Sequence, residues 1–244
     1  MAFVTRAKNF IKIRFPRLAF FLHSTLRKEA RQLKRLSAEA VFDEKYRTNA
    51  WEDDQTVSGP GSNLEQTEVI REELQRLLRE LGIGSMLDIP CGDFFWMRLL
   101  DRGAAAYMGA DIVEGIIESN RSKYGENEQV KFLTLDLTRD PLPRADLVLC
   151  RDCLVHFSFR DIRRALKAIR NSGSEYLLTT TFTRPMERNQ EIITGGWRPL
   201  NLQQPPFNFP DPCELINEGC PADGGKYADK CLGLWRITDL PVKG

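Results

Sequence analysis

The sequence predicts an α/β protein built on a doubly wound, mostly parallel sheet. Short apolar runs alternate with helical patterns between residues 63 and 182, and acidic residues stand at the ends of several of these runs. Strands that alternate with helices form parallel sheets. The chain has 244 residues, of which 42% are hydrophobic and 28% charged, enough for one well-packed domain with an extension.

The first 40 residues differ in charge from the rest of the chain. They hold ten Lys and Arg and two Glu, a formal charge of +8, so the rest must carry about −7 to give the total of +1. We therefore expect a basic N-terminal arm at 1–40, forming a helical extension, and one domain at 41–244. The arm either packs on the domain or a partner subunit, or makes peripheral contact with an anionic membrane. The near-zero total argues against a general nucleic-acid binder.

A loop and a helix precede the first strand. Trp51 and the turn Ser58–Ser62, with two Gly and one Pro, are typical of an ordered loop, which either covers a ligand or caps the next helix. Apolar residues at helical spacing predict an amphipathic helix over Asn63–Leu81. Asn63 is its expected cap, and Gly82 its expected end.

The first strand, Met86–Ile89, is predicted to run into a tight turn at Pro90-Cys91-Gly92 and then into a helical run, Phe94–Leu100. A strand that turns into a helix presents free backbone N–H groups to a polar ligand, and Gly92 lets the backbone approach that ligand closely. Asp88 stands at the same edge, where open α/β sheets bind ligands. We expect the aromatic residues that follow the turn to be core residues rather than a wall against a planar ligand.

Acidic residues also close the next two apolar runs. Asp111 ends the second run, nineteen residues after Gly92, where dinucleotide folds place the carboxylate that binds ribose hydroxyls. Asp136 closes the third run, Val130–Leu135. The fourth run, Asp146–Cys150, has the apolar character of a buried parallel strand. The pattern predicts a nucleoside site at the carboxyl ends of these strands.

The remaining elements follow from the same patterns. They are helices over Glu114–Tyr124 and from Ser158 onward, and strands over Glu175–Phe182 and Leu232–Ile237. Ser158 and Asp161 resemble a capping box. Between the last two strands, Thr183–Asp211 is rich in Pro, aromatic and amide residues and includes Gly195-Gly196-Trp197-Arg198. This composition suggests substrate-facing loops around one more strand.

These motifs resemble those of class I S-adenosylmethionine-dependent methyltransferases. They are Asp88-x-x-x-Gly92, Asp111, Asp136-Leu137 and Asp146-Leu147-Val148-x-Cys150-Arg151-Asp152. Within that superfamily the chain is similar to a bacterial group that carries Ser58-Gly59-x-Gly61-Ser62 upstream of Leu87-Asp88-Ile89-Pro90-Cys91-Gly92-Asp93. The resemblance implies a Rossmann-like, seven-stranded sheet with an antiparallel edge hairpin.

The same resemblance implies S-adenosylmethionine (SAM) as the cofactor. On the matching positions, the implied cofactor-binding residues are Asp88, Pro90, Cys91, Gly92, Asp93, Asp111, Ile112, Asp136, Leu137 and Arg151. We expect the turn at 90–93 to approach the methionine part of the cofactor and Asp136 to lie beside the adenine.

The acceptor is expected to be a small molecule or a glycan. A hydroxyl acceptor needs a base to take its proton, and the predicted catalytic residues are Asp152 and His156, with Asp54 as a weaker third. His156 could instead only bond backbone, and Asp152 could contact the methionine amino group. An amine acceptor could need no base. Trp51, His156, Trp197 and Phe207 are the residues expected against the acceptor.

Two other function classes are alternatives to a methyltransferase. A nicotinamide-dependent oxidoreductase needs Gly-x-Gly-x-x-Gly after the first strand, but this turn has one glycine, and Asp93 would repel a pyrophosphate. A non-catalytic SAM-binding module is the second alternative. The six cysteines are too sparse for a disulfide framework, and we interpret Cys150-x-x-Cys153 as buried thiols rather than a metal site. A cytoplasmic protein without a metal is therefore expected.

Overall fold

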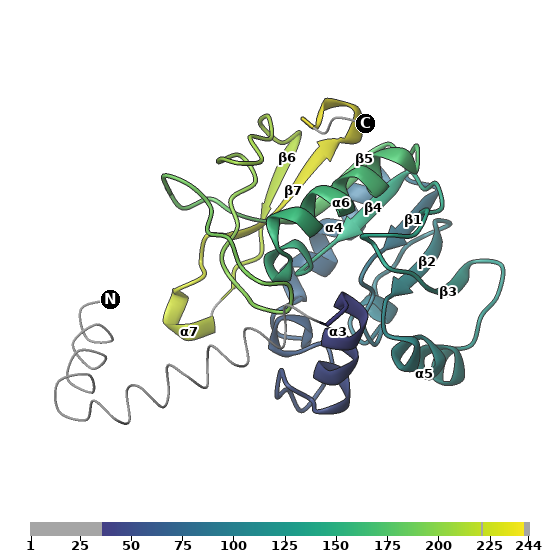
Figure 1. Cartoon of the computed structure of the whole chain (residues 1–244). Coiled ribbons are helices and arrows are strands. Elements are labelled where there is room, and N and C mark those ends of the chain that lie inside the picture. The colour runs from purple at the N-terminus through teal and green to yellow at the C-terminus, as the bar shows by residue number, and fades with distance from the viewer. Residues whose placement is uncertain (1–35, 221, 242–244) are drawn as a thin grey trace, which may run out of the picture. The chain divides into compact units, whose positions relative to one another are not determined.

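A seven-stranded sheet with the order β3-β2-β1-β4-β5-β7-β6 forms the centre of the computed structural model (Figure 1). Its strands are β1 (Ser85–Asp88), β2 (Ala106–Asp111), β3 (Val130–Thr134), β4 (Leu147–Cys150), β5 (Tyr176–Phe182), β6 (Glu214–Asn217) and β7 (Lys230–Arg236). Strands β1 to β5 pair in parallel, whereas β7 runs antiparallel to both β5 and β6. The predicted Rossmann-like sheet with an antiparallel edge pair is confirmed.

The structure describes residues 36–220 and 222–241. The expected basic arm and its helical extension lie outside the described residues, except for the last five residues of the arm. From Ala38 onward the chain forms one unit. None of the helices within the described residues has the length and apolar character needed to cross a bilayer.

Helices cover both faces of the sheet because the central strands are apolar on both faces. In β4, Leu147 and Leu149 pack in one apolar cluster with helix α4 (Glu68–Glu80), while Val148 and Cys150 pack in the other with α6 (Phe159–Asn171). Helix α5 (Glu114–Tyr124) contacts β2 and β3. Within the described residues, the remaining helices are α3 (Ala38–Arg47), the short α7 (Ala222–Gly225) and four 3₁₀ turns, η1 (Pro60–Ser62), η2 (Met97–Leu99), η3 (Leu154–His156) and η4 (Ile237–Asp239).

Two helix starts agree with their sequence signals to different degrees. Ser158 caps α6 as predicted, because its hydroxyl accepts the backbone N–H of Asp161. Helix α4 begins at Glu68, five residues later than expected. The predicted cap, Asn63, instead accepts the Gln66 N–H at 3.0 Å, so it closes a separate turn ahead of the helix.

The helix predicted directly after the β1 turn is absent from the structure. Only the single 3₁₀ turn η2 forms there, and Phe94 ahead of it has φ 58°, a left-handed conformation that cannot continue a right-handed helix. The Phe94 ring is buried and lies 4.9 Å from the Tyr107 ring, centroid to centroid. The expectation that Phe94 belongs to the core is confirmed, but the site lacks the helix N-terminus that the sequence suggested.

The loop region after β5 also differs from the prediction in one respect. Thr183–Asp211 contains no strand; the sixth strand, β6, follows it at Glu214–Asn217.

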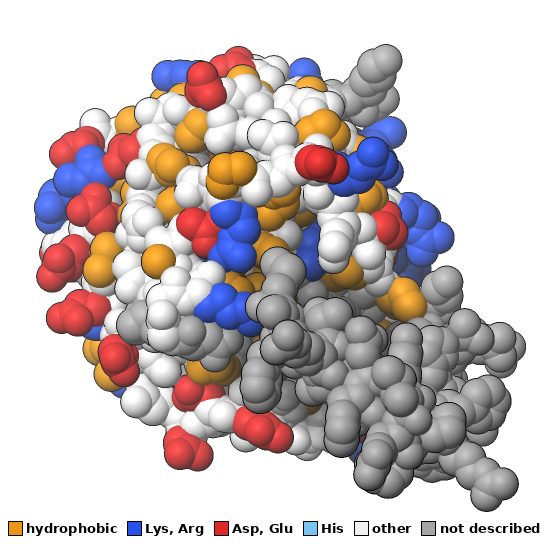
Figure 2. Space-filling view, turned by 90° about the vertical axis from the view of Figure 1, so that its left-hand side faces the viewer, with side chains coloured by type: hydrophobic (Ala, Val, Ile, Leu, Met, Phe, Trp, Pro, Cys, Tyr) orange, Lys and Arg blue, Asp and Glu red, His pale blue; other side chains and the backbone are white. Residues whose placement is uncertain are grey.

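On the face shown in Figure 2, acidic side chains gather along one edge, with basic and apolar side chains between them and the centre of the view.

Candidate functional site

A cavity of about 420 Å³ opens where the parallel strands end. Asp88 at the end of β1, Asp111 at the end of β2 and Asp152 just after β4 all line it. Its volume falls within the range of small-molecule sites, roughly 300–1,000 Å³. The Ser58–Ser62 turn forms part of the same wall, so this loop covers the cavity rather than only capping the next helix.

The turn after β1 is held by contacts that bring backbone to the cavity. Gly92 has φ 53°, and its N–H donates to Asp111 Oδ2 at 3.1 Å. A Cβ at Gly92 would lie 2.1 Å from Ser58 Oγ, so a larger residue would collide with the covering loop. Pro90 and Cys91 line the cavity beside Gly92, as the resemblance implied.

Two buried carboxyl groups sit side by side in this end of the cavity. Asp88 accepts the Tyr107 hydroxyl at 2.8 Å, and burial raises the pKa of Asp88 to about 7. Asp111 Oδ1 accepts the Val113 N–H at 3.0 Å, and burial raises the pKa of Asp111 to about 6 although backbone N–H groups oppose the shift. A carboxylate has about four acceptor positions, so Asp111 keeps capacity for ligand hydroxyls after its two backbone bonds.

Asp136, after β3, completes this end of the cavity. Its Oδ1 accepts both the N–H of Thr138 at 2.8 Å and the Thr138 hydroxyl at 2.7 Å, which fixes the carboxyl group in the turn. Ile112 and Leu137 line the wall nearby. Trp96 also lines the cavity while being 7% exposed, so among the three aromatics after the β1 turn it is the one that meets the cavity.

Asp93 does not line the cavity, unlike the rest of the predicted turn. Its carboxylate instead accepts the Thr56 hydroxyl at 2.8 Å, the Val57 N–H at 3.1 Å and the Ser58 hydroxyl at 3.3 Å. The Asp93 N–H donates to Ser58 Oγ at 3.2 Å. These contacts fasten the covering loop to the β1 turn, and the cofactor contact expected of Asp93 stays a prediction.

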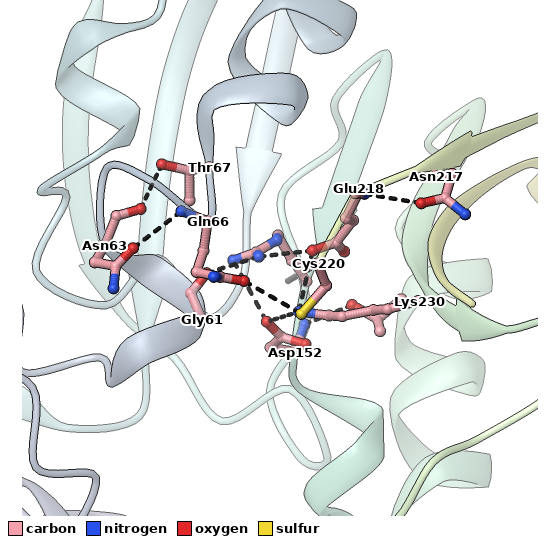
Figure 3. Close-up of polar contacts among 12 residues, drawn as sticks. Gly61, Asn63, Gln66, Thr67, Asp152, Asn217, Glu218, Cys220 and Lys230 are labelled. Carbon is pink, nitrogen blue, oxygen red and sulfur yellow. Dashed lines mark hydrogen bonds and ion pairs between the residues drawn. The ribbon is translucent and has the colours of Figure 1, made fainter. Parts of the chain in front are cut away.

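Four charged side chains form a network at the opposite side of the cavity (Figure 3). Lys230 Nζ lies 2.6 Å from Asp152 Oδ2 and 3.0 Å from Glu218 Oε2. Arg151 Nη2 donates to Glu218 Oε2 at 2.8 Å and to the Gly61 carbonyl at 2.7 Å. Arg151, Asp152 and Lys230 line the cavity. Two cations and two anions thus balance, and Arg151 also ties the covering loop to β4.

The two predicted catalytic residues differ in chemistry. Burial opposes ionisation of Asp152, but Lys230 and Arg151 outweigh it and lower the pKa of this carboxyl to about 2. A carboxylate so strongly held in its charged form is a weak proton acceptor at neutral pH. Asp152 also has φ 49°, and its N–H donates to Thr180 Oγ1 at 2.8 Å. At neutral pH Asp152 is therefore a charged group at the cavity wall, held by Lys230 and Arg151.

His156 in η3 lines the same cavity, and its Nδ1 lies 2.7 Å from the Gly196 carbonyl oxygen. Because a carbonyl only accepts, Nδ1 carries the proton, which leaves Nε2 with its lone pair. Nε2 has no hydrogen-bond partner within 36–220 and 222–241. Burial lowers the pKa of His156, so the ring is neutral at neutral pH. The backbone bond foreseen as an alternative is present and leaves the other nitrogen available.

Aromatic side chains surround the His156 end of the cavity. Trp51 lies 6.3 Å from the His156 ring, and Trp197 lies 5.1 Å from Tyr227, in both cases between ring centroids. Trp197 is 43% exposed although it lines the cavity. Two sequence candidates lie elsewhere. Phe207 is a core residue packed on Phe159, and Asp54 is exposed and outside the cavity wall.

Several residues of the cavity had not been singled out from the sequence. Lys230 and Tyr227 come from the C-terminal region, far along the chain from the motifs, as does Glu218, which pairs with Lys230 but does not line the cavity. A lysine that opens an otherwise apolar strand was the one available signal, whereas Glu218 and Tyr227 carry no sequence signature. The cysteines Cys150 and Cys153 are free buried thiols, and no group of three metal-ligating side chains occurs within the described part of the chain.

A family model described as "Methyltransferase domain" matches residues 86–172, which contain most of β1, all of β2 to β4, and helices α5 and α6. This central stretch of the chain is similar to that family. The match contains Asp88, Asp111, Asp136, Asp152 and His156. The cofactor that this domain implies is SAM.

Solved structures are also similar to the chain at low identity. Human N-acetylserotonin methyltransferase in complex with SAM is 16% identical, with a TM-score of 0.50, over 82% of this chain and 60% of that chain. Magnesium protoporphyrin IX methyltransferase from Synechocystis PCC 6803 with bound SAM is 16% identical, with a TM-score of 0.47, over 61% of this chain and 78% of that chain. Among the curated proteins, no sequence matches the chain.

Proposed function

We propose that this protein transfers the methyl group of SAM to a hydroxyl of a small molecule or glycan, with His156 as the proton acceptor. The observation that carries the proposal is the His156 ring, whose Nδ1 is bonded to the Gly196 carbonyl in the same cavity as the Asp111 carboxylate. SAM, when bound, supplies a methyl group on a sulfonium that is already a good leaving group. The chain must then orient the two reactants and accept a proton.

The residues present fit SAM. The Asp111 carboxylate can accept ribose hydroxyls, and Asp136 stands at the adjacent strand end, where the adenine is expected. The backbone at Gly92 approaches the cavity without a side chain. The charged network offers both a carboxylate, Asp152, for an ammonium and a cation, Lys230, for a carboxylate. These complementary charges suit the zwitterionic methionine part of the cofactor.

A hydroxyl acceptor is favoured over an amine by the state of His156. A neutral imidazole with Nε2 unprotonated can take the hydroxyl proton as the methyl group transfers, whereas a neutral amine already presents a nucleophilic lone pair. The aromatic residues Trp51, Trp197 and Tyr227 form an apolar surround for the acceptor's body. The rings of phenols and of sugars both pack on aromatic side chains. A hydroxyl on either kind of ring therefore fits the wall of Trp51, Trp197 and Tyr227.

The experiment is a comparison of two measurements. Calorimetric titrations with SAM, S-adenosylhomocysteine and NAD come first, and we expect binding of the first two only. Formation of S-adenosylhomocysteine from SAM is then measured with three probes: catechol, methyl β-glucoside and benzylamine. Turnover with a hydroxyl probe that His156→Gln abolishes supports the proposal. Turnover with benzylamine alone, or turnover unchanged in His156→Gln, contradicts it. NAD binding in place of SAM would favour an oxidoreductase.

A further inference from the structure

Arg198 is a buried cation whose hydrogen bonds go to backbone carbonyls. It is 3% exposed, and its guanidinium donates to the carbonyl oxygens of Leu154 at 3.0 Å, Val155 at 2.7 Å and Phe157 at 2.9 Å. Its Nε donates to the Gln190 carbonyl at 3.2 Å. Within the part of the chain that the structure describes, it makes no ion pair with a carboxylate. A buried charge is unfavourable unless hydrogen bonds replace its lost hydration. The bonds from Arg198 to these carbonyls supply that replacement and at the same time hold the turn in place.

Those carbonyls stand on both sides of His156. They belong to η3 and the residue after it. The Leu154 carbonyl also accepts the Phe157 N–H at 3.2 Å, but so short a 3₁₀ turn cannot supply partners for all of its carbonyls. The chain around Arg198 also reaches the turn through its backbone. Gly195 N–H donates to the His156 carbonyl at 2.9 Å, and Arg198 N–H donates to the Val155 carbonyl at 3.2 Å. The segment 195–198 therefore grips the turn 154–157 through both main chain and side chain.

We propose that Arg198 is a positioning residue, which keeps the His156 turn where Nδ1–H donates to the Gly196 carbonyl and Nε2 remains a free base in the cavity. The inference rests on the proposed role of His156. Gly196 is two residues from Arg198, so the guanidinium and the carbonyl that selects the tautomer move as one unit. Trp197 lies between Gly196 and Arg198 in the chain. The bonds between segment 195–198 and the turn 154–157 therefore also fix Trp197 relative to His156.

Arginine suits this task better than lysine. Its planar fork presents several donors in fixed directions and reaches three carbonyls at once, whereas an ammonium is a single point charge. The charged groups that face His156 are Asp152 from the end of β4, Lys45 from α3 and Arg198 itself. Burial, Lys45 and Arg198 lower the pKa of His156, whereas its bond to the Gly196 carbonyl and the charge of Asp152 raise it, and the net direction is down. Lys45 and Arg198 thus favour the neutral form of the imidazole, which the bonds from segment 195–198 orient.

The tautomer can be measured without any acceptor, because the chain has two histidines, His23 and His156. Nitrogen-15 NMR distinguishes a protonated ring nitrogen from an unprotonated one, and His156→Gln assigns the signals. Above the pKa of the ring, we expect wild-type His156 to carry its proton on Nδ1. Arg198→Met should lose most of this Nδ1–H population and give a mixture with the Nε2–H form. An Nε2–H wild-type ring, or an unchanged Nδ1–H population in folded Arg198→Met, would overturn the proposal.

Two further variants make the test specific. Arg198→Lys keeps a buried charge and serves if Arg198→Met does not fold; we expect the same direction of change, and an unchanged tautomer contradicts the fork argument. Arg184→Met removes an arginine from the same loop region, one that bonds Asp229 instead. We expect it to leave the tautomer unchanged, and an equal loss there would mean general loosening rather than positioning. Failure of SAM binding would end the proposed function without altering the tautomer, so the two ideas fail separately.

Discussion

The two ends of the cavity are built differently. At the first end, Asp88, Asp111 and Asp136 each follow one of the parallel strands, and the geometry comes from the sheet itself. At the second end, Trp51, His156, Trp197 and Lys230 come from loops and a distant strand and are held by side-chain contacts. A site made of strand ends is visible in local sequence patterns, whereas one made of distant loops is not.

Their electrostatics differ in the same way. The strand-end side holds buried carboxyls that burial makes harder to ionise, with the pKa of Asp88 raised to about 7. On the loop side, each charge of the Asp152–Lys230 pair is matched, and Lys230 and Arg151 outweigh burial to lower the pKa of Asp152 to about 2. We infer that the first end binds neutral hydroxyls, while the second combines a charged anchor with a neutral base.

The comparison is tested most strongly at His156. His156→Gln removes the base but keeps a side chain that can donate to the Gly196 carbonyl. General base catalysis contributes roughly 10²- to 10⁴-fold, so we expect kcat with a hydroxyl probe to fall by that factor while SAM affinity stays within about twofold. S-adenosylhomocysteine formation and calorimetry measure the two quantities. Loss of SAM affinity equal to the loss of kcat would show that the ends are not separable.

Asp93 tests whether the covering loop joins the two ends. Asp93→Ala removes the acceptor for Thr56, Val57 and Ser58, and bonds to charged groups contribute about 1.5–3 kcal/mol each. We expect SAM affinity to fall by about tenfold or more, since the Ser58–Ser62 wall is released. Calorimetry is the measurement, and Glu65→Ala, an exposed acid nearby, is the matched control. Unchanged affinity in Asp93→Ala would mean that the loop closes without this fastening.

Trp197 tests the acceptor wall alone. Trp197→Ala should raise the KM for a ring-bearing acceptor by roughly 2- to 12-fold, because an aromatic contact contributes about 0.5–1.5 kcal/mol. SAM affinity should stay the same, since Trp197 belongs to the aromatic wall that we propose for the acceptor and not to the charged network that we propose for SAM. Steady-state kinetics with the responsive hydroxyl probe measure both. A change confined to SAM binding would place Trp197 at the wrong end.

The buried acids predict a pH dependence of stability. Burial raises the pKa of Asp88 to about 7 and that of Asp111 to about 6, so the folded state binds more protons than the unfolded state between about pH 4 and about pH 7. The free energy of unfolding of the ligand-free protein should therefore fall as pH rises through this window. Asp88→Asn should reduce this dependence of the free energy of unfolding on pH. Each kcal/mol by which the pH-dependent change becomes smaller corresponds to about 2–4 °C in Tm. Melting curves across the window would show it, and a slope unaltered in Asp88→Asn would contradict the assignment.

The same contrast explains what could be predicted from sequence. The parallel strands, α5 and the Ser158 cap were found because periodicity and capping are local signals. The prediction of a helix after β1 was wrong. Phe94 buries its ring with a left-handed backbone, and this tertiary effect is not included in helix propensity. The contacts of Asp93 with the covering loop were not predicted, because its partners lie 35 to 37 residues upstream.

The loop side was harder still. Glu218 and Lys230 meet Arg151 and Asp152 because β7 inserts next to β5, and no local pattern encodes that neighbourhood. The Gly195–Arg198 segment was noticed for its composition alone. Its grip on the His156 turn depends on carbonyl positions that only the folded chain supplies.

The central claim is that Asp111 binds the ribose of SAM, and one set of titrations tests it. Calorimetry with SAM and S-adenosylhomocysteine compares wild type, Asp111→Ala, Asp111→Asn and the exposed control Glu114→Ala. A charge-assisted bond contributes about 1.5–3 kcal/mol, so Asp111→Ala should weaken both ligands by roughly 10- to 150-fold. Asp111→Asn should be milder because its amide oxygen still accepts, and Glu114→Ala should match wild type. Equal affinity of wild type and Asp111→Ala for SAM would contradict the account.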